Sequence, residues 1–210
     1  MSQLEIRSFV LGMVATNCYL AINKETKEAL IIDPADNAPR IARELDKAGA
    51  HPVAILLTHG HFDHILAVDD LRDKYRIPVY CHKDEEEVLE KDALNMASMI
   101  GRLYSTKADV LLRDEEQLKL AGFDIIVFHT PGHTKGGVCY YLPEEQTLFS
   151  GDTLFCGSVG RTDFPTGSMI TLIRSVKEKL FVLPDDVRVY PGHDMETSIG
   201  YEKRYNPFIV

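Results

Sequence analysis

A continuous apolar run, VAILLT at residues 53–58, leads directly into a cluster of polar residues, HGHFDH at 59–64. The run shows no alternation of apolar and polar side chains, which predicts a β-strand covered on both faces. Histidine and aspartate side chains lose hydration at the end of such a strand, and this loss costs free energy unless a partner replaces the water. A metal ion is such a partner, because it binds several imidazole and carboxylate groups that converge on one point. The stretch therefore predicts a buried strand with a metal site at its carboxyl end.

Strands and helices follow one another in two similar rounds along the chain. Residues 38–48 have the spacing of an amphipathic helix, with Asn37 as N-cap, Pro39 in the first turn and Gly49 at the end. Two rounds of strands followed by helices predict two sheets packed against each other with helices outside. The expected strands are 4–10, 17–22, 29–33, 53–58, 78–81 and 187–190, with more inside 117–150, and the expected helices are 38–48, 66–75, 170–181 and one that begins within 85–90.

Length and composition are those of an ordinary globular protein. The 210 residues are 45% hydrophobic and 26% charged, so we expect residues 1–210 to form a single α/β domain. The four cysteines form no C-x-x-C pair, which predicts buried free thiols. The apolar stretch near the start is interrupted by Thr16 and Asn17, so it is a poor signal peptide. The expected location is the cytoplasm.

The net charge of -9 argues against two classes of partner. Nucleic acids and anionic membranes are usually bound by a basic surface, so neither is expected to bind this chain. A local basic pocket is still compatible with this net charge. The acidic clusters 84–87 and 114–116 are expected at helix starts or on solvated faces.

Three further candidate ligands follow other predicted strands. His133 ends the stretch TPGH at 130–133 and His193 ends PGH at 191–193, each after a Pro-Gly turn, and Asp152 follows a strand in FSGDT. Carboxyl ends of strands in layered α/β proteins are common ligand sites. With His59, His61, Asp63 and His64, these residues are too many for one tetrahedral ion and suit two, if Asp152 bridges them. Two such ions can share a bridging hydroxide formed near neutral pH and can stabilise the oxyanion that its attack creates.

Four stretches together resemble the metallo-β-lactamase superfamily: THGHFDH at 58–64, TPGHTKGG at 130–137, SGDTLF at 150–155 and YPGHD at 190–194. Within it the chain resembles the glyoxalase II, or hydroxyacylglutathione hydrolase, group in a short form without the helical C-terminal domain. The resemblance implies a four-layer αββα sandwich with the metals at the edge of its two sheets. It also implies a first metal site of His59, His61 and His133, a second site of Asp63, His64 and His193, and Asp152 bridging both.

The resemblance also implies a function. A metal-bridging hydroxide, held with Asp63 and Asp152 as catalytic residues, would hydrolyse S-D-lactoylglutathione or a related acyl-thioester. Zinc is the expected ion of the pair, with iron and manganese as alternatives, since all three accept mixed nitrogen and oxygen ligands.

Substrate recognition departs from the full-length family pattern. Glyoxalase II has a Gly-Lys-Phe-Tyr stretch after the bridging aspartate, where this chain has Gly-Arg-Thr-Asp at 160–163. Arg161 is therefore the candidate substrate-binding residue, and pairing with Asp163 is the structural alternative. Further cations could come only from Lys203 and Arg204, if they approach the pocket. Asp33, which ends a predicted strand, is a candidate to orient a ligand histidine.

Two alternative functions remain open from the sequence. Iron-dependent persulfide dioxygenases share the fold and a closely similar Gly-Arg-Thr-Asp-Phe stretch, and resemblance to them implies one iron on His59, His133 and Asp152. A non-catalytic metal-binding module is the second alternative. The complete ligand set argues against a module, because a decayed site should have lost some ligands.

Overall fold

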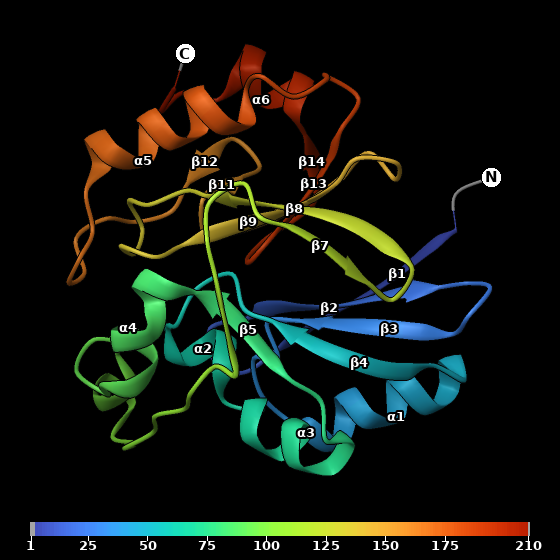
Figure 1. The fold of residues 1–210 in the computed structure, drawn as a ribbon. Helices are drawn as coiled ribbons and strands as arrows, with labels where there is room; N and C mark the ends of the chain where they lie inside the picture. The colour runs from blue at the N-terminus through green and yellow to red at the C-terminus, as the bar shows by residue number, and fades with distance from the viewer. Residues whose placement is uncertain (1–2, 210) are drawn as a thin grey trace.

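A computed structural model describes residues 3–209, and two six-stranded sheets form its centre (Figure 1). Strands in the first sheet follow chain order, and those in the second have the order β14-β13-β10-β9-β8-β7. The first sheet contains β1 (Leu4–Leu11), β2 (Thr16–Asn23), β3 (Glu28–Ile32), β4 (His51–Leu56), β5 (Val79–His82) and β6 (Val110–Leu112). The second contains β7 (Gln117–Leu120), β8 (Phe123–His129), β9 (Val138–Leu142), β10 (Thr147–Gly151), β13 (Arg188–Pro191) and β14 (Thr197–Ser198), and β11 (Leu154–Phe155) pairs with β12 (Ser158–Val159).

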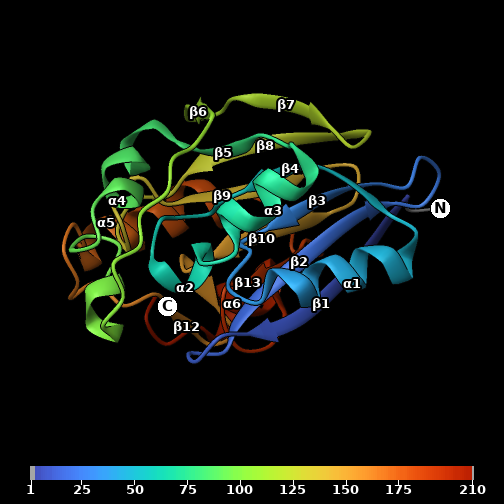
Figure 2. The ribbon, with the colours of Figure 1, turned by 90° about the horizontal axis from the view of Figure 1, so that it is seen from below.

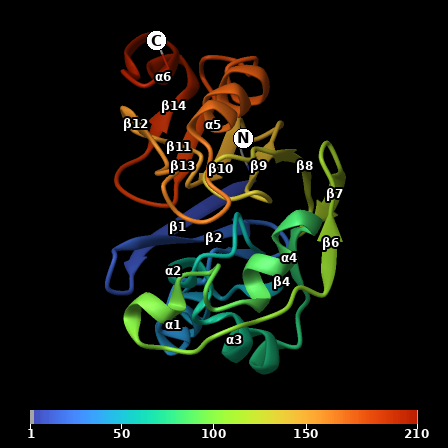
Figure 3. The ribbon, with the colours of Figure 1, turned by 90° about the vertical axis from the view of Figure 1, so that its left-hand side faces the viewer.

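Helices cover the outer face of each sheet, as the views from below and from the side show (Figures 2 and 3). The first sheet is covered by α1 (Ala38–Ala48) and α3 (Val68–Tyr75). The second is covered by α5 (Met169–Ser175), which continues into the π-helix η3 (Val176–Leu180), and by α6 (Ile199–Tyr205). Short helical segments follow the first sheet's strands: α2 (Phe62–Ile65), η1 (Lys83–Glu85), α4 (Glu86–Glu90) and η2 (Ala97–Ile100). The predicted αββα sandwich is confirmed.

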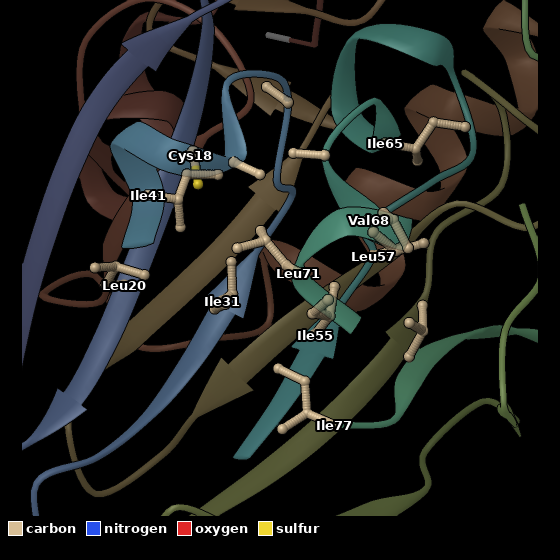
Figure 4. Packing of buried hydrophobic residues seen from close by; sticks show 14 of the residues in the cluster. Cys18, Leu20, Ile31, Ile41, Ile55, Leu57, Ile65, Val68, Leu71 and Ile77 are labelled. Atoms are coloured by element: carbon tan, nitrogen blue, oxygen red, sulfur yellow. The ribbon is translucent and has the colours of Figure 1, made fainter. Parts of the chain in front are cut away.

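Successive side chains of a strand point to opposite faces of its sheet, so the buried residues fall into three cores: one between the two sheets and one beneath the helices on each outer face. In β3, Ile31 packs among residues of α1 and α3, as Figure 4 shows, whereas Leu30 and Ile32 face the second sheet. On the second sheet, Tyr140 belongs to the core between the sheets and Tyr141 to the core beneath α5. Both faces of each sheet are therefore buried, as the unbroken apolar run in β4 predicts.

Several element boundaries differ from those read in the sequence. Strand β4 ends at Leu56, two residues before the predicted end, so Thr58 and His59 lie in the loop beyond it. The predicted helix at 170–181 is α5 followed by one π-helical turn. The sequence reading missed β6, β14 and α6, which are short. Among the described residues, no helix is both long and apolar enough to cross a bilayer.

Strand direction gathers the loops that carry polar residues. Strands β8 and β10 are both antiparallel to β9, and β10 is parallel to β13, so the carboxyl ends of β8, β10 and β13 meet at one edge. Backbone hydrogen bonds join the two sheets at this edge, from Val138 N–H to the Thr58 carbonyl (2.8 Å) and from Asn17 N–H to the Gly192 carbonyl (2.7 Å). The loops of the two sheets are thereby held against each other.

Candidate metal centre

The structure brings all seven predicted ligand side chains together at this common edge. They fall into three overlapping groups, and within each group the potential ligand atoms lie within 4.8 Å of one another. The loop after β4 and helix α2 supply four of them, and the loops after β8, β10 and β13 supply one each. The groups are His59, His61 and His133; His59, His64 and Asp152; and Asp63, His64 and His193.

The distances between ligand atoms suit a small divalent ion. Two ligands bound at about 2.0–2.2 Å to one tetrahedral ion lie about 3.3–3.6 Å apart. In the third group, Asp63 Oδ2 lies 3.4 Å from His64 Nε2 and 3.3 Å from His193 Nε2. Asp152 reaches both sides of the cluster, with its oxygens 3.4 Å from His64 Nε2, 3.5 Å from His193 Nε2 and 3.5 Å from His133 Nε2.

Buried atoms without a hydrogen-bond partner mark the same place. Among the described residues these atoms include the Nε2 nitrogens of His59, His61 and His64 and the Oδ1 oxygen of Asp152. Such atoms are costly unless a partner compensates for the lost water. Four unpartnered donors or acceptors in one cluster fit divalent metal ions as the missing partners, and the residues present supply the nitrogen and oxygen atoms that such ions bind.

Residues around the cluster orient the histidine rings. The Asp33 carboxylate lies 2.9 Å from His64 Nδ1 and accepts hydrogen bonds from the Thr58 hydroxyl (2.6 Å) and the Thr58 N–H (2.8 Å). With its proton directed to Asp33, Thr58 Oγ1 can accept from His59 Nδ1 at 3.1 Å. His133 Nδ1 lies 2.7 Å from the Arg161 carbonyl. In the neutral form of each of these rings the proton thus resides on Nδ1, so the Nε2 lone pair faces the cluster, where His133 Nε2 lies 2.9 Å from His61 Nδ1.

The protonation states of the cluster follow from burial and proximity. Burial, followed by the neighbouring imidazoles, holds the pKa of His59 well below its usual value. Burial likewise lowers the pKa of His61 to about 3. Burial alone would raise the pKa of Asp152, but His64 outweighs it and holds that pKa at about 2. His64 itself has a raised pKa, because Asp63 and Asp152 outweigh its burial. His59 and His61 as neutral imidazoles and Asp152 as a carboxylate are therefore in the forms that bind metals, whereas His64 must lose a proton when an ion binds.

Close packing explains the glycine of the last Pro-Gly turn. A Cβ atom on Gly192 would collide with Asp152 Oδ1 and would lie 2.8 Å from His64 Cε1. Any larger residue would therefore displace two members of the cluster.

Two residues that hold the site were not found by the sequence reading. Glu85 belongs to an acidic cluster expected at a helix start or on a solvated face. It does lie at a helix start, as the N-cap residue of α4, but its side chain is fully buried. Its carboxylate accepts hydrogen bonds from Gly60 N–H, Gly136 N–H and the Thr134 hydroxyl, and so joins the loops that carry His59, His61 and His133. The Thr16 hydroxyl donates to Asp63 at 2.7 Å. Both contacts link segments that are distant in sequence, so no local sequence pattern predicts them.

Comparison with known proteins decides the family. The sequence pattern of the metallo-beta-lactamase superfamily matches residues 11–193. The chain belongs to this superfamily. It is 38% identical over 205 residues to the probable metallo-hydrolase YqgX of Bacillus subtilis, covering 97% of this chain and 96% of that protein. It is 37% identical over 199 residues to the hydroxyacylglutathione hydrolase GloC of Haemophilus influenzae, covering 92% of each.

Solved structures of other superfamily members have the same fold. BLEG-1 B3 metallo-beta-lactamase superposes with a TM-score of 0.94 at 44% identity, covering 98% of this chain and 99% of that one. ETHE1 from Myxococcus xanthus gives a TM-score of 0.83 at 30% identity, with 98% and 84% covered. TTHA1623, solved in a di-iron-bound form, gives 0.83 at 38% identity, with 96% and 99% covered. The predicted resemblance is confirmed, and this chain is a superfamily member whose site supports divalent metal ions.

Arg161, the predicted substrate-binding residue, lies beside the candidate metal centre. It lines a pocket of about 320 Å³ together with His61, Asp152 and His193. Its guanidinium forms two hydrogen bonds of 2.7 Å with Asp163 and stacks over Phe164, with 3.8 Å from Cζ to the ring centroid.

The two cations near the chain end do not line this pocket. Lys203 and Arg204 both pair with Asp185 instead, at 2.7 and 3.6 Å. Lys203 and Arg204 therefore do not add positive charge to the pocket that Arg161 lines.

Proposed function

We propose that this protein is a binuclear metal-dependent thioester hydrolase of glyoxalase II type, with His59, His61 and His133 holding one divalent ion, Asp63, His64 and His193 a second, and Asp152 bridging the two. Zinc is the proposed ion, and iron and manganese are the alternatives to be tested. The proposed substrate is a small acyl-thioester, and the proposed location is the cytoplasm.

The position of Asp152 is the observation that carries the proposal. Its Oδ2 atom lies 3.5 Å from both His133 Nε2 and His193 Nε2, which belong to different ligand groups. A carboxylate that faces ligands of two groups can serve two ions at once, whereas a single ion on His59, His133 and Asp152 would leave the approach of Asp152 to His193 unused.

The chemistry supplied by two such ions is a hydroxide nucleophile near neutral pH and stabilisation of a developing oxyanion. Asp63 and Asp152 both line the pocket, and both have pKa values below the usual range because neighbouring histidines outweigh their burial. As carboxylates they would accept hydrogen bonds from the attacking water and orient it. In the overall reaction one water is consumed, the bond from the carbonyl carbon to sulfur breaks, and a carboxylic acid and a thiol are formed.

The test is hydrolysis of S-D-lactoylglutathione and of simple acyl-thioesters by protein loaded in parallel with zinc, iron or manganese. Asp63→Ala should keep the fold and most of the metal but lower turnover at least about 100-fold. Asp70→Ala, which removes an exposed aspartate from the first turn of α3, should leave turnover unchanged. Folded, metal-loaded protein that hydrolyses no thioester would refute the proposal.

Metal stoichiometry separates this proposal from the alternative of an iron-dependent persulfide dioxygenase. That reaction implies one iron on His59, His133 and Asp152. Asp63, His64 and His193 form a further group of ligands close enough to hold an ion, and this favours two ions. One iron per chain, with oxygen uptake on a glutathione persulfide, would replace the hydrolase proposal.

A further inference from the structure

The pocket above the candidate metal centre has a wall of apolar side chains that the ligand residues do not explain. Besides Arg161 and the candidate ligands it is lined by Val14, Phe62, Met96, Met99, Ile100 and Phe164. Three of these, Met96, Met99 and Ile100, come from the segment around η2. Resting on the hydrolase function proposed above, we infer that this wall binds an apolar acyl arm, so that the preferred substrates are thioesters of medium-length apolar acids and not of lactate.

The wall is a built part of the site. The Phe62 N–H, one residue before Asp63, donates to the Asn95 carbonyl at 2.7 Å. The fully buried Asn95 side chain donates to the Tyr104 carbonyl (2.8 Å) and accepts from Ala97 N–H (2.9 Å). The Tyr104 hydroxyl in turn donates to the carbonyl of Ile65, the last residue of α2. Helix α2, which carries two candidate ligands, therefore holds both ends of the η2 segment.

Charge in the pocket argues against recognition of a glutathione moiety. Glutathione carries two carboxylates and an ammonium group, which need charged partners in a specific site. Among the described residues that line the pocket, Arg161 is the only lysine or arginine, and Asp163 already occupies its Nε and Nη2 atoms. A substrate carboxylate could pair with Arg161 only by breaking its ion pair with Asp163, and this loss would offset much of the free energy gained from the new ion pair.

Size and chemistry favour the acyl arm. A volume of about 320 Å³ is at the small end of ligand pockets, so it suits one arm of a thioester and not a whole tripeptide conjugate. Methionine side chains adapt to apolar groups of different shape. Met99 is 65% exposed and Val14 is 46% exposed, so each has apolar surface that a ligand could cover. Each methylene buried there should raise kcat/KM about fourfold until the pocket is filled.

The test compares kcat/KM of the metal-loaded full-length protein along a series of glutathione thioesters: D-lactoyl, acetyl, butanoyl, hexanoyl and octanoyl. The hexanoyl ester should exceed the lactoyl ester at least about tenfold. Hexanoyl-N-acetylcysteamine, whose thiol carries no charge, should be hydrolysed within about threefold of hexanoylglutathione. A preference for the lactoyl ester, or a large loss with the uncharged thiol, would overturn the inference.

A pair of variants ties the preference to the wall. Met99→Gln replaces an exposed side chain of similar length, so the fold should survive, and the hexanoyl-to-lactoyl ratio should fall at least about threefold. Leu103→Gln changes a residue of the same segment that is 89% exposed and does not line the pocket, and it should leave the ratio unchanged. An unchanged ratio in Met99→Gln would overturn the inference even if the protein hydrolyses thioesters. Absence of all thioester hydrolysis would instead refute the function proposed above.

Discussion

Asp33 should control metal affinity without touching a metal, because its carboxylate sets the tautomers of two ligand histidines. It accepts a hydrogen bond from His64 Nδ1 directly, and it accepts another from the Thr58 hydroxyl, which leaves Thr58 Oγ1 as the acceptor for His59 Nδ1. Asp33→Asn places an NH₂ group where one carboxylate oxygen was. The Thr58 N–H bond requires an oxygen on the other side, so the NH₂ must face both the Thr58 hydroxyl and His64. Both rings then accept at Nδ1 and carry their proton on Nε2, where it blocks metal binding.

The expected loss is about 10- to 100-fold in affinity for each ion, or about 1.4–2.7 kcal/mol, which is typical when a ligand loses its orienting partner. The fold should persist, because Asp33 has a φ of 48° and asparagine tolerates this left-handed conformation. Thr58→Val is the matched control. It removes the connection to His59 but keeps the contact from Asp33 to His64, so it should weaken one ion and spare the other.

Competition with a chromophoric chelator measures both affinities, and circular dichroism checks the fold. Two ions bound by Asp33→Asn with affinities within about threefold of the wild type would refute the tautomer argument. Equal weakening of both ions in Thr58→Val would refute the division of roles between Asp33 and Thr58.

Two further predictions concern stability. Glu85→Ala leaves two backbone N–H groups without an acceptor, and it should lower the free energy of unfolding, measured in urea, by about 1–3 kcal/mol. Burial raises the pKa of Glu85 to about 7, so the substitution also removes an unfavourable burial, but the lost hydrogen bonds outweigh that gain. Equal effects of Glu85→Ala and of the exposed control Glu86→Ala would contradict this prediction. Burial lowers the pKa of His61 to about 3, so below pH 6.5 the unfolded metal-free chain binds a proton that the folded chain does not. The stability of metal-free His61→Gln relative to wild type should therefore rise as the pH falls from about 6.5 to 3, by up to about 1.4 kcal/mol per pH unit, and a flat difference would show that His61 is not buried in its neutral form.

The candidate ligands could be predicted from sequence because each belongs to a local pattern. His59, His133, Asp152 and His193 all follow the end of a predicted strand, and strand direction in the two sheets brings these ends to one edge. The layered architecture followed from the same apolar runs. Helix α1 was predicted with its bounds, since Asn37 and Gly49 cap it as the sequence indicates.

The groups that hold the ligands in place were harder to predict, since their contacts join distant parts of the chain. Glu85 reads locally as one acid among four, and only the approach of the loop at 130–137 makes it a buried acceptor. Three residues of the apolar wall lie in a segment whose single short 3₁₀ turn has too few residues for a hydrophobic period. Asp33 is the exception: the sequence suggested it as an orienting residue, and it contacts His64.

The division of the ligands between the two sheets links metal binding to the packing of the sandwich. Four candidate ligands follow strands of the first sheet and three follow strands of the second, and Asp152 of the second lies 3.4 Å from His64 of the first. An ion bound between them would bind the packed sheets and not separated ones, so its binding energy would add to the stability of the packing. Glu85 and the backbone bond from Asn17 to Gly192 join the sheets at the same edge without a metal. These contacts keep the ligands close before an ion arrives, which reduces the ordering that metal binding must impose on the loops.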